Sequence, residues 1–132
     1  MLPHASVYVR LGISPIDGIG VFAIRAIPAG TNIFANDVVD IIWIDRATLD
    51  WERLSPAERR LYDDFGIRNG ALIGCPVNFH NLTPGWYCNE PRDGEVANVA
   101  VGPDQSFIAS RDIAEGEELT ISYANLTAAA AS

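Results

Sequence analysis

The sequence predicts a small, mainly β domain, on three observations. Short runs rich in Val, Ile and Tyr alternate with turns that contain Gly and Pro, a pattern typical of short strands. Only one stretch carries a full set of helix signals. The chain has 132 residues, 48% of them hydrophobic, which suits one domain with its own core.

The first third of the chain is expected to form strands joined by turns. Residues 7–9 and 21–24 are the first two strands, on either side of a turn-rich link at 15–20. After a second turn at 28–30, residues 32–34 and 38–44 continue the β pattern. The run 38–44 is dense enough in Val and Ile to predict a buried strand.

The middle of the chain holds the predicted helix. Ser55 suits the N-cap, Pro56 the first helical position and Glu58 the third residue of a capping box. We expect this helix to run to about Phe65 and to end at Gly66. From 67 to 84 the short apolar runs return, broken by Gly and Pro, and indicate strands or extended loops.

The last third predicts two more strands, at 106–110 and 118–123, joined by a turn at 112–116. The segment 127–132 is rich in alanine with nothing to anchor it, and we expect a flexible, frayed tail. The predicted organisation is therefore one domain over residues 1–126, followed by that tail.

The charge balance bears on possible partners. Nine basic residues, all arginine, stand against 17 acidic ones, a formal net charge of -8. Such a chain repels phosphate backbones, which argues against direct nucleic-acid binding and favours a basic protein partner. Acidity that serves solubility alone is the competing explanation.

Cellular context follows from what the sequence lacks. No apolar run reaches the about 18 residues that span a membrane, and the N-terminus lacks a signal-peptide pattern. The two cysteines, Cys75 and Cys88, have neither Cys-x-x-Cys nor zinc-ligand spacing. We expect a soluble cytoplasmic protein with buried thiols and no metal.

Three segments could carry chemistry, and each has an ordinary alternative. Residues 17–23 place two glycines where backbone can approach a ligand, although a tight turn needs the same residues. A Rossmann fingerprint is excluded because the third glycine and the helix are missing. Residues 86–91 place Asn89 where it could read an adenine edge or fix a turn. Residues 111–123 end in Tyr123, which is either a site residue or a packing residue.

Taken in order, the three segments resemble the SET-domain family of lysine methyltransferases. The opening segment reads Ser-x-Ile-x-Gly-x-Gly-Val-Phe-Ala from Ser14 to Ala23, and the closing one reads Arg-Asp-Ile-x-x-Gly-Glu-Glu-Leu-Thr-x-x-Tyr from Arg111 to Tyr123. The resemblance covers about residues 6–35 and 86–124. It implies a SET-domain (β-clip-like) fold of several short sheets, with one short helix in the insert and a C-terminal pseudoknot-like crossing.

The resemblance also implies a function and a set of site residues. The function is transfer of methyl groups from S-adenosylmethionine to lysine side chains of a protein. In this family the cofactor is bound by the Gly-x-Gly turn and by the asparagine box, which here is Asn89 with Glu90. The closing tyrosine, here Tyr123, lies beside the methyl-transfer site. The implied cofactor residues are Gly18, Ile19, Gly20, Val21, Asn89 and Glu90. Aromatic candidates for the wall of the lysine channel are Tyr62, Phe79, Trp86 and Tyr87.

Two departures from the family pattern leave alternatives open. Glu90 and Pro91 stand where the motif has His and Ser, and a competing register would place the box at residues 78–81. No cysteine-rich segment follows Tyr123, so the missing wall has to come from substrate, a partner or a second subunit, and we expect a homodimer. The alternatives to a methyltransferase are a non-catalytic SET-like module that binds a basic peptide, and an enzyme of another class on a related β-fold.

Overall fold

The structure, a computed structural model, describes residues 3–37 and 40–131. Within that part of the chain the strands form three small antiparallel sheets, in the orders β1-β2-β8, β3-β5-β4 and β6-β7. The strands are β1 (Val9–Ile13), β2 (Ile19–Ala23), β3 (Ile41–Asp45), β4 (Ile67–Asn69), β5 (Leu72–Pro76), β6 (Val99–Val101), β7 (Phe107–Ala109) and β8 (Glu118–Leu119). The mainly β prediction is confirmed.

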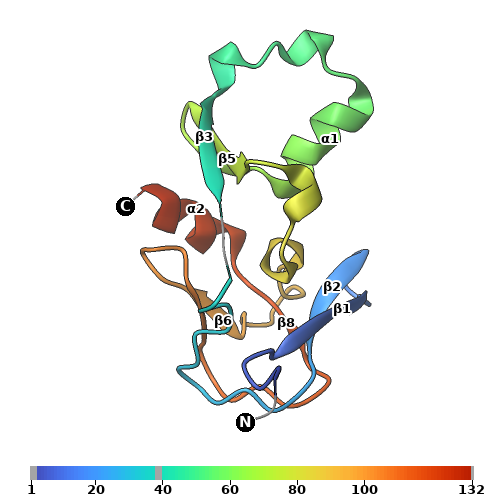
Figure 1. Cartoon of the computed structure of the whole chain (residues 1–132), viewed down its shortest axis with the longest axis vertical. Coiled ribbons are helices and arrows are strands. Elements are labelled where there is room, and N and C mark those ends of the chain that lie inside the picture. The colour runs from blue at the N-terminus through green and yellow to red at the C-terminus, as the bar shows by residue number, and fades with distance from the viewer. Residues whose placement is uncertain (1–2, 38–39, 132) are drawn as a thin grey trace.

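The helical segments are short. Within residues 3–37 and 40–131, two α-helices, α1 (Pro56–Phe65) and α2 (Tyr123–Ala131), accompany four 3-10 turns. These turns are η1 (Arg46–Thr48), η2 (Trp51–Arg53), η3 (Phe79–Asn81) and η4 (Pro84–Tyr87). In Figure 1, β3, β5 and α1 make up one end of the molecule, β1, β2, β6 and β8 make up the other, and α2 lies between them. We call these two ends the insert and the core.

The core is built from strands and loops that lie far apart in the sequence. β2 pairs with β1 on one side and, through Val21 and Phe22, with β8 on the other. Buried apolar side chains from all of these segments pack together: Val9, Val21, Ala23, Ile27, Ile33, Cys88, Val99, Ala109, Ile113, Leu119 and Ile121. Burial of this cluster is the main stabilising contribution to the sheet that carries the Gly-x-Gly turn.

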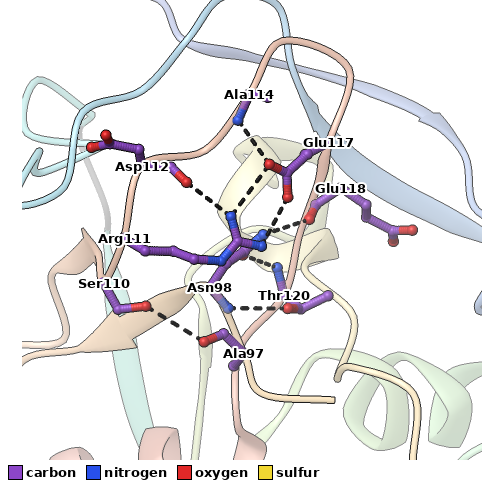
Figure 2. Close-up of polar contacts among 9 residues, drawn as sticks. All are labelled: Ala97, Asn98, Ser110, Arg111, Asp112, Ala114, Glu117, Glu118 and Thr120. Carbon is purple, nitrogen blue, oxygen red and sulfur yellow. Dashed lines mark hydrogen bonds and ion pairs between the residues drawn. The ribbon is translucent and has the colours of Figure 1, made fainter.

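A chain crossing brings the C-terminal segment into the core. Asn89 and Thr120 form a parallel bridge, and the Ile121 N–H donates to the Asn89 carbonyl at 3.0 Å. On the other side, the Asn98 amide donates to the Glu118 carbonyl and accepts from the Thr120 N–H, both at 2.9 Å (Figure 2). The segment 118–121 is therefore held between residues 89 and 98, which is the crossing that the family resemblance implies.

Helix α1 begins and ends where its sequence signals predict. Ser55 accepts from the Glu58 N–H at 3.1 Å, and the Glu58 carboxylate accepts from the Ser55 N–H at 2.9 Å, completing the capping box. Gly66 ends the helix with φ of -86°, so no left-handed residue is involved. Glycine is needed there because an added Cβ would collide with the Tyr62 carbonyl oxygen.

Removing this cap gives a direct test of the helix assignment. Ser55→Ala should lower the free energy of unfolding by about 1 kcal/mol, because the Glu58 N–H loses its acceptor. Ser55→Asp keeps an acceptor and should retain parental stability. Urea unfolding followed by circular dichroism measures both, and equal midpoints for the alanine variant and the parent would contradict the assignment.

Strand β3 is less buried than the sequence predicts. Its side chains are exposed or half-buried, with Ile42 at 40% and Trp43 at 38% exposure. The expectation of a buried strand over 38–44 is therefore wrong for residues 40–44, and residues 38–39 lie outside the described part. β3 is at the edge of a three-stranded sheet, so a run of β-branched residues here reflects strand propensity rather than enclosure.

The C-terminal segment differs most from the expectation. The predicted strand 118–123 is reduced to β8, and Tyr123 begins helix α2, so the chain has a second helix outside the insert. Helix α2 extends to Ala131, and residue 132 lies outside the described part; the flexible tail expected at 127–132 stays a prediction. Alanine has the highest helix propensity, and contacts with β4 and β6 add to it.

Candidate functional site

The Gly-x-Gly turn is fixed from inside by Ser14. The Ser14 N–H donates to the Gly18 carbonyl at 2.8 Å, while its buried hydroxyl oxygen accepts from the N–H groups of Ile16 and Asp17 at 2.9 and 3.3 Å. Gly18 has φ of +48°, a left-handed conformation that favours glycine. Asp17, Gly18 and Ile19 are exposed, so the turn presents its outer side to a ligand.

Asn89, 72 residues after Asp17 in the sequence, forms hydrogen bonds to this turn. Its side-chain N–H₂ donates to the Asp17 carbonyl at 2.9 Å and to the Glu118 carboxylate at 3.0 Å, with a longer contact of 3.5 Å to the Ile19 carbonyl. The side chain is only 9% exposed. Asn89 therefore fixes the Gly-x-Gly turn with its amide nitrogen.

The competing box at residues 78–81 has a different environment. Asn78 caps η3, with its side-chain oxygen accepting from the His80 N–H at 2.9 Å. Within residues 3–37 and 40–131, no side chain of this segment bonds to the Gly-x-Gly turn. The geometry therefore places residue 89, rather than residue 78, against the candidate cofactor turn.

Tyr123 lies close to Asn89, because it forms a hydrogen bond to the neighbouring residue Cys88. Its hydroxyl donates to the Cys88 carbonyl at 3.0 Å, one residue before Asn89. Partial burial raises the pKa of Tyr123, and nearby Glu90, Cys88 and Asp17 raise it further. The phenol is therefore protonated at neutral pH. The Cys88 thiol is inert there too, because burial, with a contribution from Glu118, raises its pKa to about 12.

A cavity of about 710 Å³ opens on one side of Tyr123. Apolar and aromatic lining comes from Phe34, Ile41, Phe65, Trp86, Phe107, Ile121 and Leu126. Its charged lining is Asp37, Asp63, Asp64, Asp104 and Arg68, and Arg68 is paired with Asp63 at 3.2 Å. Neither the Gly-x-Gly turn nor Asn89 borders the cavity, so Tyr123 stands between the two places.

The four aromatic channel candidates lie in different environments. Trp86, in η4, lines the cavity together with Tyr123. Tyr62 and Phe79 pack edge to face with ring centroids 5.4 Å apart, and neither lines the cavity. Tyr87 packs in the same way against Phe65, also at 5.4 Å, and contacts the core.

The candidate cofactor residues differ in how exposed they are to solvent. Gly18 and Ile19 are exposed in the turn, and Glu90 is exposed beside Asn89. Val21 is fully buried in the core, and its backbone lies in the middle strand of the sheet, paired with Leu11 and Leu119. Gly20 packs against the Glu118 carboxylate, which an added Cβ would displace.

Two residues of this arrangement were not singled out from the sequence as site residues. Ser14 and Glu118 belong to the opening and closing segments, but nothing in their spacing shows that they meet. The Ser14 hydroxyl lies 2.8 Å from both Glu118 carboxylate oxygens, across 104 positions of sequence. Only the pairing of β2 with β8 reveals the contact.

Two kinds of feature are absent from the described residues. Over 3–37 and 40–131, no helix has the length and apolar character needed to cross a membrane. In the same ranges, no three His, Cys, Asp or Glu side chains lie together as metal ligands would.

Comparison with known proteins is consistent with this geometry. No curated protein matches the sequence. Among solved structures, the crystal structure of a proposed histone methyltransferase from Plasmodium falciparum superposes with a TM-score of 0.54 at 18% identity, over 89% of this chain and 93% of that one. At this identity the match shows the fold. The sequence profile of the SET domain matches residues 18–124, most of the chain. The chain therefore belongs to the SET-domain family.

Proposed function

We propose that this chain is an S-adenosylmethionine-dependent methyltransferase that acts on lysine side chains of a basic protein. One observation carries the proposal: adjacent residues hold the two halves of the site. Asn89 binds the Gly-x-Gly turn through its side chain, and Cys88 binds the Tyr123 hydroxyl through its carbonyl. A cofactor at the turn and a lysine in the cavity would then meet at Tyr123.

The residues present fit the cofactor. The exposed backbone at Gly18 and Ile19, with no atom within 4 Å of the place of a Gly18 Cβ, leaves room for its amino-acid end. Exposed Asp17 and Glu90 supply negative charge, which suits a ligand that carries a sulfonium and an ammonium group. Gly20, Val21 and Asn89 would support the turn from behind, through strand pairing and the chain crossing. Glu90, in place of the usual His, therefore fits the charge of the cofactor.

The chemistry divides between cofactor and protein. When bound, the cofactor supplies an electrophilic methyl group. The protein must present a neutral lysine amine, which costs about 4 to 5 kcal/mol at pH 7 for a free lysine of pKa about 10.4. Trp86 and the apolar cavity wall lower that cost, because exclusion of water disfavours the ammonium form. The aspartates that line the cavity favour a substrate with further basic residues.

Tyr123 is suited to orient the amine. Its hydroxyl hydrogen is donated to the Cys88 carbonyl, so the oxygen lone pairs remain available to accept from an N–H of the incoming lysine amine. A fixed dipole in this position also stabilises the charge that moves during transfer. The raised pKa keeps the hydroxyl protonated, and hence keeps this orientation, throughout the neutral range.

Calorimetry with S-adenosylmethionine, followed by transfer of radiolabelled methyl to a lysine-rich peptide, tests the proposal. The chain has no lysine, so label in the peptide cannot be confused with side-chain self-methylation. Cofactor binding together with label on lysine is the expected result. Absence of cofactor binding at millimolar concentration would overturn it, and binding of the peptide alone would favour the non-catalytic module.

A further inference from the structure

The Glu118 carboxylate joins the opening segment, the asparagine box and the closing segment. It accepts from the Ser14 hydroxyl, 2.8 Å from both carboxylate oxygens, and from the Asn89 side-chain nitrogen at 3.0 Å. The backbone of Glu118 is fixed as well, since β8 pairs with β2 and the Asn98 amide donates to its carbonyl at 2.9 Å. The carboxylate is thus a fixed acceptor behind the turn.

This acceptor decides how Ser14 is oriented. Because the single Ser14 hydroxyl hydrogen is directed at the carboxylate, the oxygen lone pairs face the other way, toward the N–H groups of Ile16 and Asp17. These two N–H groups belong to the turn proposed to hold the cofactor. Loss of the carboxylate would leave the hydroxyl free to rotate and to present its hydrogen to them.

The same carboxylate orients Asn89. An ionised carboxylate only accepts, so it selects the nitrogen end of the Asn89 amide and rejects the oxygen end. With the nitrogen in place, Asn89 can also donate to the Asp17 carbonyl at 2.9 Å. Gly20 lies against the carboxylate, so the turn and Glu118 also fit each other in shape.

We propose that Glu118 is a positioning residue that sets the conformation of the turn at residues 14–20 and the orientation of Asn89, so that both are ready to receive the cofactor. Glu118 does not contact the reacting groups and acts through Ser14 and Asn89. The part that concerns the cofactor rests on the function proposed above, whereas the part that concerns the turn does not.

The neighbouring residue provides a matched control. Glu117 has the same side chain and pairs with Arg111 at 2.9 Å on the surface. Figure 2 shows the Glu118 carboxylate pointing away from Arg111, while that of Glu117 points toward it. Substitution of either glutamate by glutamine therefore changes the charge equally but affects different contacts.

The experiment compares Glu118→Gln with Glu117→Gln in two measurements. The first is amide hydrogen exchange of Ile16 and Asp17 in the cofactor-free protein, which should be faster by about tenfold only in Glu118→Gln, the effect expected when a hydrogen bond to a charged group is lost. The second is the Kd for S-adenosylmethionine by calorimetry, which should rise by about tenfold only in the same variant. At saturating cofactor, turnover should fall less than Kd rises.

The outcomes separate the two proposals. Parental exchange at Ile16 and Asp17 in Glu118→Gln would overturn the positioning role, whatever the cofactor result. If the parent does not bind cofactor, the function proposed above fails, and exchange still tests the turn. Should Glu118→Gln fail to fold, Ser14→Ala removes the hydroxyl that donates to Glu118 and accepts from the N–H groups of Ile16 and Asp17. That variant should show the faster exchange, and parental exchange there would overturn the inference.

Discussion

Tyr123→Phe should reduce methyl-transfer turnover by about 100-fold or more while leaving the fold and the cofactor affinity nearly unchanged. The substitution removes the hydroxyl proposed to orient the amine, and preorganised dipoles of this kind contribute about 3 to 4 kcal/mol. The lost hydrogen bond to the Cys88 carbonyl involves a side chain that is 45% exposed, so its effect on stability should stay near 1 kcal/mol or less. Single-turnover methylation of a lysine-rich protein, with cofactor binding measured alongside, gives both quantities.

Tyr87→Phe is the matched control for this prediction. Tyr87 packs against Phe65, and its hydroxyl makes no hydrogen bond within residues 3–37 and 40–131. Turnover should therefore stay at the parental level in that variant. Parental turnover in Tyr123→Phe as well would mean that Tyr123 is a packing residue at the start of α2 and has no part in the reaction.

Asn89→Ala should weaken cofactor binding by about 1 to 3 kcal/mol and also lower the free energy of unfolding by a similar amount. Its amide nitrogen is the donor to the Asp17 carbonyl and to the Glu118 carboxylate, and both acceptors would lose a partner in a nearly buried place. Calorimetry with S-adenosylmethionine and urea unfolding measure the two losses separately.

Asn81→Ala provides the comparison for Asn89. Asn81 is exposed at the end of η3, and its hydrogen bond to the Asn78 carbonyl is made by the backbone, which alanine retains. Both measurements should be parental for Asn81→Ala. Parental cofactor affinity in Asn89→Ala would show that the asparagine box of this chain does not support the cofactor site.

The sequence predicts best those elements that depend on neighbouring residues alone. The start of α1 follows from Ser55, Pro56 and Glu58, because a capping box involves only four successive residues. Burial of β3 could not be predicted in the same way, since it depends on what covers the sheet. The helix at 123–131 was missed because alanine-rich composition is compatible with either a frayed end or a helix, and contacts with β4 and β6 favour the helix.

The candidate site likewise has parts that the sequence predicts and parts that it does not. The order of three short motifs identified the family, and with it the turn, Asn89 and Tyr123 as candidates. Their joining through Glu118 and Cys88 could not be foreseen, because it depends on contacts between segments far apart in the sequence. The separations are 29 for Asn89 with Glu118, 35 for Cys88 with Tyr123 and 104 for Ser14 with Glu118. Aromatic type alone likewise did not separate Trp86, which lines the cavity, from Tyr62 and Phe79, which pack on each other.

The peptide bond between Cys88 and Asn89 has a mechanical consequence for the proposed reaction. Successive Cα atoms across a trans peptide are about 3.8 Å apart, a spacing that thermal motion hardly changes. Since one of these residues holds the turn and the other holds Tyr123, the alignment of donor and acceptor is tied to a covalent length. The cavity walls at residues 63–68 come from the insert and meet the segment of Tyr123 through packing of β4 on α2. The spacing of donor and acceptor in the proposed reaction therefore depends on a covalent link, whereas the spacing between Tyr123 and these walls depends on non-covalent packing.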